Sequence, residues 1–189
     1  MRRSIRPVVV ACCFTVACRD PIASVDPIAA TPPQTALASE GGVGLSVTGS
    51  GHVYRNLTGE PELTTFSYSA IRRVDGTTNG EFQINFRAAT FSIKGTVTCV
   101  TVKGNTAWIG GFIDWIKSDD PGDQALTGTD IWWRVTDNGQ GADDPPDLTT
   151  SILFTLPGSP ITAASWCRDQ PLAALSRPIA HGNIQIRSE

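Results

Sequence analysis

The chain has 189 residues and a net charge of −3, with only 17 % charged residues and with 18 glycines and 13 prolines. A chain of this length can bury one full hydrophobic core, and this composition is typical of an exported all-β protein rather than a helical one. Because the net charge is negative, we expect no nucleic-acid partner bound through a basic face.

Residues 1–17 have the pattern of a targeting segment, with three arginines followed by the apolar run 8–17. The run is too short for a membrane-spanning helix, which needs about 20 residues. Cys18 follows in the sequence Thr-Val-Ala-Cys, which resembles the lipobox of bacterial lipoproteins, where this cysteine becomes the lipidated first residue. That family prefers leucine where Thr15 stands, so an ordinary cleaved signal peptide is the alternative. We predict a signal peptide over 1–17 and lipidation of Cys18.

The lipidated cysteine would hold the protein at a membrane of the bacterial cell envelope, outside the cytoplasm; without it, the protein would be secreted. Residues 18–42 carry several prolines and small residues without any periodicity. Such a segment cannot bury enough apolar surface to offset the entropy lost on ordering. We predict a flexible tether over 18–42 and a folded domain over 43–189.

Alternating apolar residues predict about eight strands in this domain. The turn signals between them indicate a mostly meandering, antiparallel order, so the predicted fold is all-β, either a sandwich or a small barrel. Two segments, 163–168 and 171–176, could form short helical turns. The expected strands cover residues 45–54, 64–72, 82–86, 91–102, 106–115, 131–135, 150–154 and 184–186.

Residues 95–111 predict a central β-hairpin, because Gly104-Asn105 is a two-residue turn signal between two apolar runs. The apolar phase changes at Cys99–Val100, which predicts a bulge or bend there. The register that follows from the turn assigns the apolar side chains to two faces. One face carries Val100, Val102, Ala107 and Ile109, and the other carries Val97, Cys99 and Trp108.

Two cysteines, Cys99 and Cys167, are left in the expected domain once the signal peptide is removed and Cys18 is lipidated. An even pair in an exported domain predicts a disulfide, which would fasten the proline-rich segment 157–178 to the central hairpin. The alternatives are two buried thiols or a metal site, to which only His52 and His181 could add imidazole ligands.

A resemblance covers nearly the whole of this domain, from about Gly49 to Arg187. The series GTVTC, VKGNTAWIGG and WRVTDNGQGADDPPD is similar to a recurrent domain in predicted secreted proteins and lipoproteins of bacteria. The resemblance implies an extracytoplasmic β-domain. It implies no activity, because the family is one of unknown function.

The loop 137–147 holds four carboxylates, an asparagine and two glycines. Ca²⁺ takes six to eight oxygen ligands, so this loop is a candidate calcium site, and we expect no other cofactor. The spacing is not that of an EF-hand, because Gly139 and Gly141 stand where side-chain ligands would be. The alternative is a polar connection closed by Asx turns. The candidate calcium ligands are Asp137, Asn138, Asp143 and Asp144.

Five tryptophans suggest a carbohydrate site, since exposed indole rings stack on sugars. Trp108 and Trp133 follow the buried phase of their strands and are expected in the core. Packing between layers is the alternative for the remaining aromatic residues. The candidate ligand-binding residues are Trp115, Trp132 and Tyr54.

Three classes of function follow. The main expectation is a non-enzymatic envelope or surface domain with a structural role or a protein partner, and the alternative is a module that binds a glycan or a small apolar molecule. A hydrolase is the remote alternative and would need a carboxylate pair such as Asp114 and Asp130. The sequence has no nucleophile elbow, P-loop or dinucleotide motif, so we expect no catalytic residue.

Overall fold

The computed structural model describes residues 42–56, 61–88, 90–141, 143–155, 159–172 and 174–188. The predicted signal peptide, Cys18 and the predicted tether lie outside these residues, apart from residue 42. The described residues form ten strands, one 3-10 helix (η1) and one α-helix (α1), which confirms the predicted all-β fold.

The long strands come first in the chain, and the shortest strands lie in its C-terminal third. In chain order they are β1 (Val43–Asn56), β2 (Pro61–Arg73), β3 (Thr78–Phe86), β4 (Phe91–Lys103), β5 (Thr106–Lys117), η1 (Pro121–Leu126), β6 (Asp130–Thr136), β7 (Leu148–Thr150), β8 (Leu153–Phe154), α1 (Ala163–Asp169), β9 (Ser176–Pro178) and β10 (His181–Ser188).

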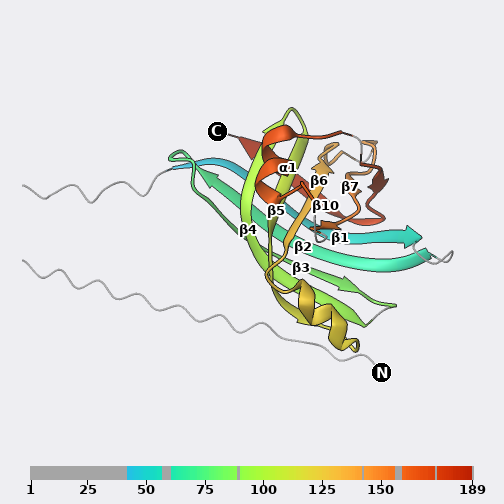
Figure 1. Cartoon of the computed structure of the whole chain (residues 1–189). Coiled ribbons are helices and arrows are strands. Elements are labelled where there is room, and N and C mark those ends of the chain that lie inside the picture. The colour runs from blue at the N-terminus through green and yellow to red at the C-terminus, as the bar shows by residue number, and fades with distance from the viewer. Residues whose placement is uncertain are drawn as a thin grey trace, which may run out of the picture. The chain divides into compact units, whose positions relative to one another are not determined.

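All ten strands belong to one sheet with the order β10-β1-β2-β3-β4-β5-β6-β7-β9, and β8 pairs with β6. From β1 to β7, strands that are adjacent in the sheet are also consecutive in the chain, as the predicted meander requires. The strands β9 and β10 lie at opposite ends of the order, yet only Ile179 and Ala180 separate them in the chain. The sheet therefore curls into a half-barrel and does not split into two stacked sheets (Figure 1).

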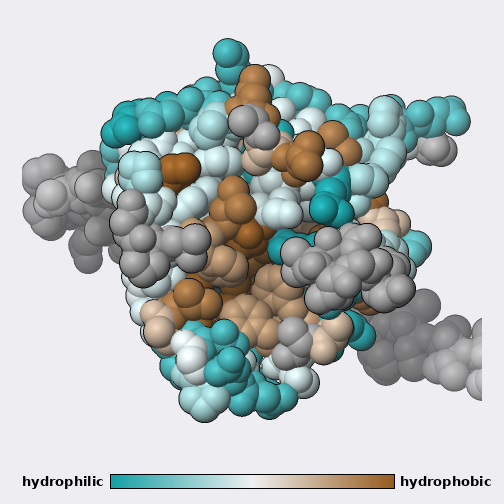
Figure 2. Space-filling view, turned by 45° about the vertical axis from the view of Figure 1, so that its right-hand side comes forward, coloured by the Kyte–Doolittle hydropathy of each residue, from teal (hydrophilic) through white to brown (hydrophobic). Residues whose placement is uncertain are grey.

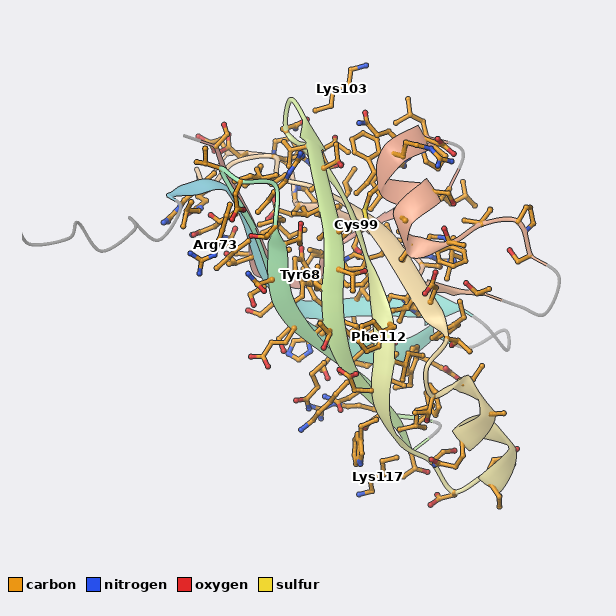
Figure 3. All side chains as sticks on the ribbon, turned by 60° about the vertical axis from the view of Figure 1, so that its left-hand side comes forward. Tyr68, Arg73, Cys99, Lys103, Phe112 and Lys117 are labelled. Carbon is orange, nitrogen blue, oxygen red and sulfur yellow. A yellow bond between two sulfur atoms is a disulfide. The ribbon has the colours of Figure 1, made fainter. Side chains whose placement is uncertain are left out.

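Aromatic contacts across the interior show how strongly the sheet curls. The ring of Tyr68 on β2 lies 5.6 Å from that of Trp133 on β6, although three strands separate β2 from β6 in the sheet. The ring of Phe82 on β3 lies 5.5 Å from the same indole. Figure 3 shows Tyr68 beside the long β4–β5 hairpin. The concave face thus closes over a hydrophobic core, with Ile84, Ile109 and other branched residues at its centre.

The hairpin register is as predicted, with Val102 opposite Ala107 and Val100 opposite Ile109. The predicted bulge is also present, between Val97 and Cys99. Because the extra residue reverses the phase of the strand, Val97 joins the concave core while Cys99 points to the outer face. The assignment of Val97 to the same face as Cys99 was therefore wrong.

Two predicted segments differ from the structure. The strand expected over 150–154 is divided into β7 and β8, and β9 was not predicted. The helical turn expected over 163–168 is confirmed as α1, whereas the described residues of 171–176 contain no helix.

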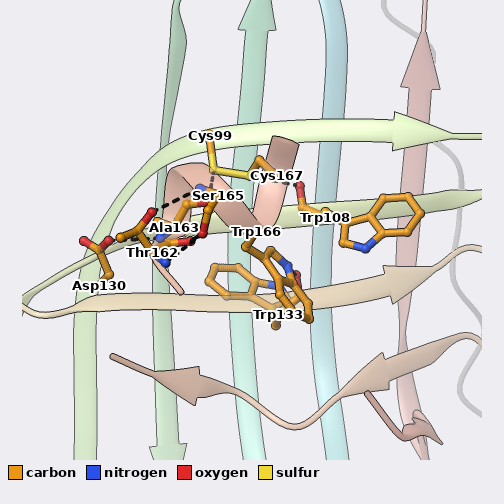
Figure 4. The surroundings of a disulfide bond; sticks show 9 residues. All are labelled: Cys99, Trp108, Asp130, Trp133, Thr162, Ala163, Ser165, Trp166 and Cys167. Atoms are coloured by element: carbon orange, nitrogen blue, oxygen red, sulfur yellow. Dashed lines mark hydrogen bonds between the residues drawn. A yellow bond between two sulfur atoms is a disulfide. The ribbon is translucent and has the colours of Figure 1, made fainter. Parts of the chain in front are cut away.

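The helix α1 covers the outer face of the β4–β5–β6 region, and the predicted disulfide between Cys99 and Cys167 holds it there (Figure 4). The side chain of Thr162 caps the helix by accepting from the backbone N–H of Ser165 at 3.1 Å. The indole N–H of Trp166 donates to the backbone oxygen of Trp133 at 3.0 Å. Beneath the helix, a second apolar cluster consists of Trp108, Trp132 and Trp166.

We expect removal of the disulfide to destabilise the domain. The bond closes a loop of 68 residues, and loop closure of that size contributes about 4 kcal/mol to the free energy of unfolding. A Cys99→Ala/Cys167→Ala double variant should therefore unfold at a lower urea concentration than the oxidised protein. Reduced wild-type protein is the matched control and should move in the same direction; equal midpoints for oxidised and reduced protein would contradict the expectation.

Candidate functional site: the hollow of the half-barrel

A hollow of about 880 Å³ lies at one end of the half-barrel, between the sheet, η1 and β8. Its apolar lining comes from three rings and two aliphatic side chains. In the space-filling view, apolar side chains gather in a hollow and hydrophilic side chains surround them (Figure 2). The apolar lining residues are Phe86, Phe91, Leu126, Ile152 and Phe154.

The sequence around the β3–β4 turn sets two of these rings side by side. Phe86 ends β3, Phe91 begins β4, and the two residues are directly opposite each other in the register, with ring centroids 5.3 Å apart. The wall at η1 begins at Asp120, whose carboxylate accepts from the backbone N–H of Gly122 at 2.8 Å, and ends at Leu126, which packs on the core. Strand ends and a capped helical turn therefore fix the shape of the hollow.

A buried cation, Arg55 on β1, stands at the inner end of this hollow. Its side chain is 5 % exposed, and its guanidinium carbon lies 5.2 Å from the ring centroid of Phe86. No described carboxylate lies within ion-pairing distance of it. Arg55 is thus the cation of the lining, and the hydroxyl side chains Thr64, Tyr68 and Thr149 line the narrow space behind it.

Beyond Arg55 the interior is almost filled. The space between Val53, Phe66, Tyr68 and Trp133 amounts to about 10 Å³, roughly the space that one water molecule occupies. Arg55 itself and Ile152 line both this narrow space and the outer hollow. The hollow thus opens outward from Arg55 and is closed inward by packed rings.

A second arginine, Arg177 on β9, is half-buried and acts electrostatically on Arg55. Burial, and secondarily the positive charge of Arg177, lower the pKa of Arg55 to about 10. A guanidinium with that pKa still carries its charge at neutral pH. The interior end of the hollow is therefore positively charged.

Four carboxylates also line the hollow, namely Glu62, which is opposite Arg55 in the β1–β2 register, and Asp119, Asp120 and Asp123 at η1. Two of these carboxylates also have structural hydrogen bonds, Asp120 to Gly122 as above and Asp123 to the hydroxyl of Ser118. The hollow therefore carries a cation on its β1 wall and carboxylates on its η1 wall.

The three residues predicted to bind ligand do not come together. Trp115 and Tyr54 are exposed, at 46 % and 51 %, but they lie on β5 and β1 with three strands between them. The ammonium of Lys94 covers the ring of Trp115 at 5.5 Å. Trp132 is only 3 % exposed because α1 covers that face of β6, so the other interpretation, packing between layers, describes its position.

The acidic loop after β6 binds the backbone of β10. One carboxylate oxygen of Asp137 accepts from the N–H of Ile186 at 2.9 Å, and the other accepts from Gly139 at 3.0 Å in an Asx turn. The buried carboxylate of Asp147 accepts from Ile184 at 2.6 Å and from Asn138 at 2.8 Å. The alternative interpretation of this loop, as a connection closed by Asx turns, therefore describes its geometry.

Three of the four candidate calcium ligands, Asp137, Asn138 and Asp144, therefore already form hydrogen bonds within the protein. Asp144 accepts from the backbone N–H of Gly141 at 2.6 Å, and the side-chain N–H of Asn138 donates to Pro146 at 2.8 Å, while Asp143 is exposed. Within the described ranges, no group of three or more His, Cys, Asp or Glu side chains is arranged to hold a metal ion. Calcium binding by this loop stays a prediction.

Other residues considered from the sequence have structural contacts. His52 and His181 are opposite each other in the β1–β10 register, with ring centroids 6.4 Å apart. The carboxylate of Asp130 accepts from the backbone N–H of Ala163 at the start of α1, at 2.9 Å. That of Asp114 accepts from the hydroxyl of Thr96 at 2.8 Å.

Sequence reasoning missed Arg55 and the hollow itself. A signal for Arg55 exists, since it follows Val53 in the inward phase of β1 while Tyr54 faces out. A charged residue in the apolar phase of a strand marks an unusual interior.

Comparison with profiles of known protein families, with curated proteins and with solved structures yielded no match. No helix among the described residues has the length and apolar character needed to cross a membrane.

We expect Asp147→Ala to weaken the domain, because it removes the acceptor of the buried N–H of Ile184 and of the part-buried N–H of Asn138. Hydrogen bonds to charged groups contribute about 1.5–3 kcal/mol each, so a loss of at least about 2 kcal/mol in the free energy of unfolding is expected. Asp143→Ala, in the same loop but exposed and without a described hydrogen bond, is the control and should change the urea midpoint little. Similar midpoints for both variants would show that Asp147 does not hold β10.

Proposed function

We propose that this domain is a non-catalytic binding module that holds the hydrocarbon chain of a small amphipathic molecule in the hollow of its half-barrel. The observation that carries the proposal is the hollow itself, about 880 Å³ in volume and lined by Phe86, Phe91 and Phe154. Small-molecule sites in proteins are concave, mostly apolar and about 300–1,000 Å³ in volume, with a few polar groups that fix orientation. The volume, the lining and the single buried arginine all agree with that description.

The shape of the hollow favours a thin chain over a protein surface. Stable protein interfaces bury about 1,200–2,000 Å² of mostly flat surface. Here Phe86 is only 8 % exposed, and Phe91 and Phe154 are half-buried beside it. An alkyl chain is small enough to lie along all three rings, whereas the hollow offers far less surface than a stable protein interface buries.

The other classes of function receive less support. A sugar would stack on an exposed indole, but Lys94 already covers one face of Trp115, and Trp132 is buried. A hydrolase would need a pair of available carboxylates, and Asp130 instead holds the first turn of α1.

The predicted anchor complements this proposal, since a lipidated Cys18 would hold the module beside a membrane, where amphipathic molecules are abundant. Expression in a bacterial host with the native leader should therefore give, in the membrane fraction, a chain cleaved before Cys18 and carrying acyl groups. Intact mass spectrometry measures this directly, with Cys18→Ala as the control. An unlipidated soluble chain would remove the anchor from the proposal and leave the binding module.

We expect Phe154→Asp to impair binding, because it places a carboxylate in the apolar lining. The matched control is Leu153→Asp, since Leu153 precedes it on β8, is 36 % exposed and does not line the hollow. Titration with an environment-sensitive alkyl dye should show dissociation constants raised about tenfold or more for Phe154→Asp, as loss of apolar contact predicts, and little change for Leu153→Asp. Equal effects of both variants, or no saturable dye binding to the wild type, would refute the proposed site.

A further inference from the structure

Building on the proposed function, we infer that the ligand is a single-chain carboxylic acid, whose carboxylate binds Arg55 at the inner end of the hollow and whose chain extends outward toward the mouth.

Arg55 has no ion pair with a described carboxylate, so its charge is available to a ligand that reaches it from the hollow. Arg55 is 5 % exposed, and its described contact is the ring of Phe86, with no carboxylate of the described chain at ion-pairing distance. Cross-strand pairing sets Glu62 opposite Arg55, yet the two side chains form no ion pair. A planar carboxylate can accept two parallel hydrogen bonds from a guanidinium, which is the strongest pairing available to this group. A ligand carboxylate would therefore supply what the fold does not.

The space on either side of Arg55 fixes the direction of the chain. Inward, between Tyr68 and Trp133, only about 10 Å³ is free, so an alkyl chain cannot pass there. Outward, the hollow offers about 880 Å³ along Phe91 and Phe154. A head group at Arg55 thus requires the chain to lie outward.

The charges on the walls of the hollow favour the same orientation. An anionic head group beside η1 would lie near Asp119, Asp120 and Asp123 and would be repelled by them. At the inner end it meets Arg55, with the half-buried Arg177 as a second positive charge nearby. The arrangement therefore favours a negative head group at Arg55 over one beside η1.

Three probes share the dodecyl chain and differ in head-group charge: dodecanoate, 1-dodecanol and dodecyltrimethylammonium. Each is used below its aggregation limit, so differences in affinity report the effect of the head group. Calorimetric titration of the folded domain should give the order dodecanoate, then dodecanol, then the cation. A charge-assisted pair at a buried site should favour dodecanoate over dodecanol by about tenfold or more. In Arg55→Met this ratio should fall close to one, and Arg55→Lys should retain part of it.

The control is Arg168→Met, because Arg168 is a solvent-exposed arginine paired with Asp169 on α1. This variant should keep the wild-type preference for dodecanoate. The urea midpoint of Arg55→Met should stay level or rise, since the variant removes a buried cation without a partner. A fall in that midpoint would indicate a structural role for Arg55, and the ratio measured with Arg55→Lys would then decide the question of binding.

The outcomes distinguish the two proposals. If none of the three probes binds, the proposed function fails and the inference fails with it. If dodecanoate and dodecanol bind wild type equally, or if the cation binds best, the module stands and the assignment of Arg55 to a carboxylate is wrong. A dodecanoate preference that survives in Arg55→Met also overturns the assignment.

Discussion

The half-barrel depends on the packing of Trp133 across its interior. The indole touches Tyr68 and Phe82, which belong to strands on the far side of the curl. The backbone oxygen of Trp133 also accepts the hydrogen bond from Trp166 on α1, so the same residue joins the concave core to the outer layer. A flat sheet could not bring β2 and β6 into contact, and the curvature therefore follows from burying these large rings together.

The curl stops short of full strand pairing between the two ends of the sheet. The backbone N–H groups of Ile184 and Ile186 on β10 donate to the carboxylates of Asp147 and Asp137 instead of to a neighbouring strand. Such side-chain acceptors satisfy an open edge without requiring the register of a strand pair. The acidic loop, whose composition suggested a metal site, thus has a structural use, because carboxylates are good acceptors for backbone donors as well as for cations.

The sequence allowed prediction of those features that depend on neighbouring residues. Gly104-Asn105 determined the register of the central hairpin, and the pair Cys99 and Cys167 predicted the disulfide. It did not allow prediction of the exposure of Trp132, because burial of that face depends on a helix more than thirty residues later in the chain. Asp147 likewise has a role that depends on β10, which no local pattern near residue 147 reveals.

The hollow was missed for a related reason. Phe86, Phe91 and Phe154 read as ordinary core residues in their strands, and whether a core is filled depends on how the ends of the strands diverge. Arg55 differs, since its inward phase on β1 is visible locally. The concave face of β1 is apolar at Val47 and Val53, and then carries this charge at the last inward position. The inward-facing residues of β1 therefore build the core along most of the strand. At its end the inward residue is an arginine and not an apolar residue, so the strand supplies a polar group where the interior opens.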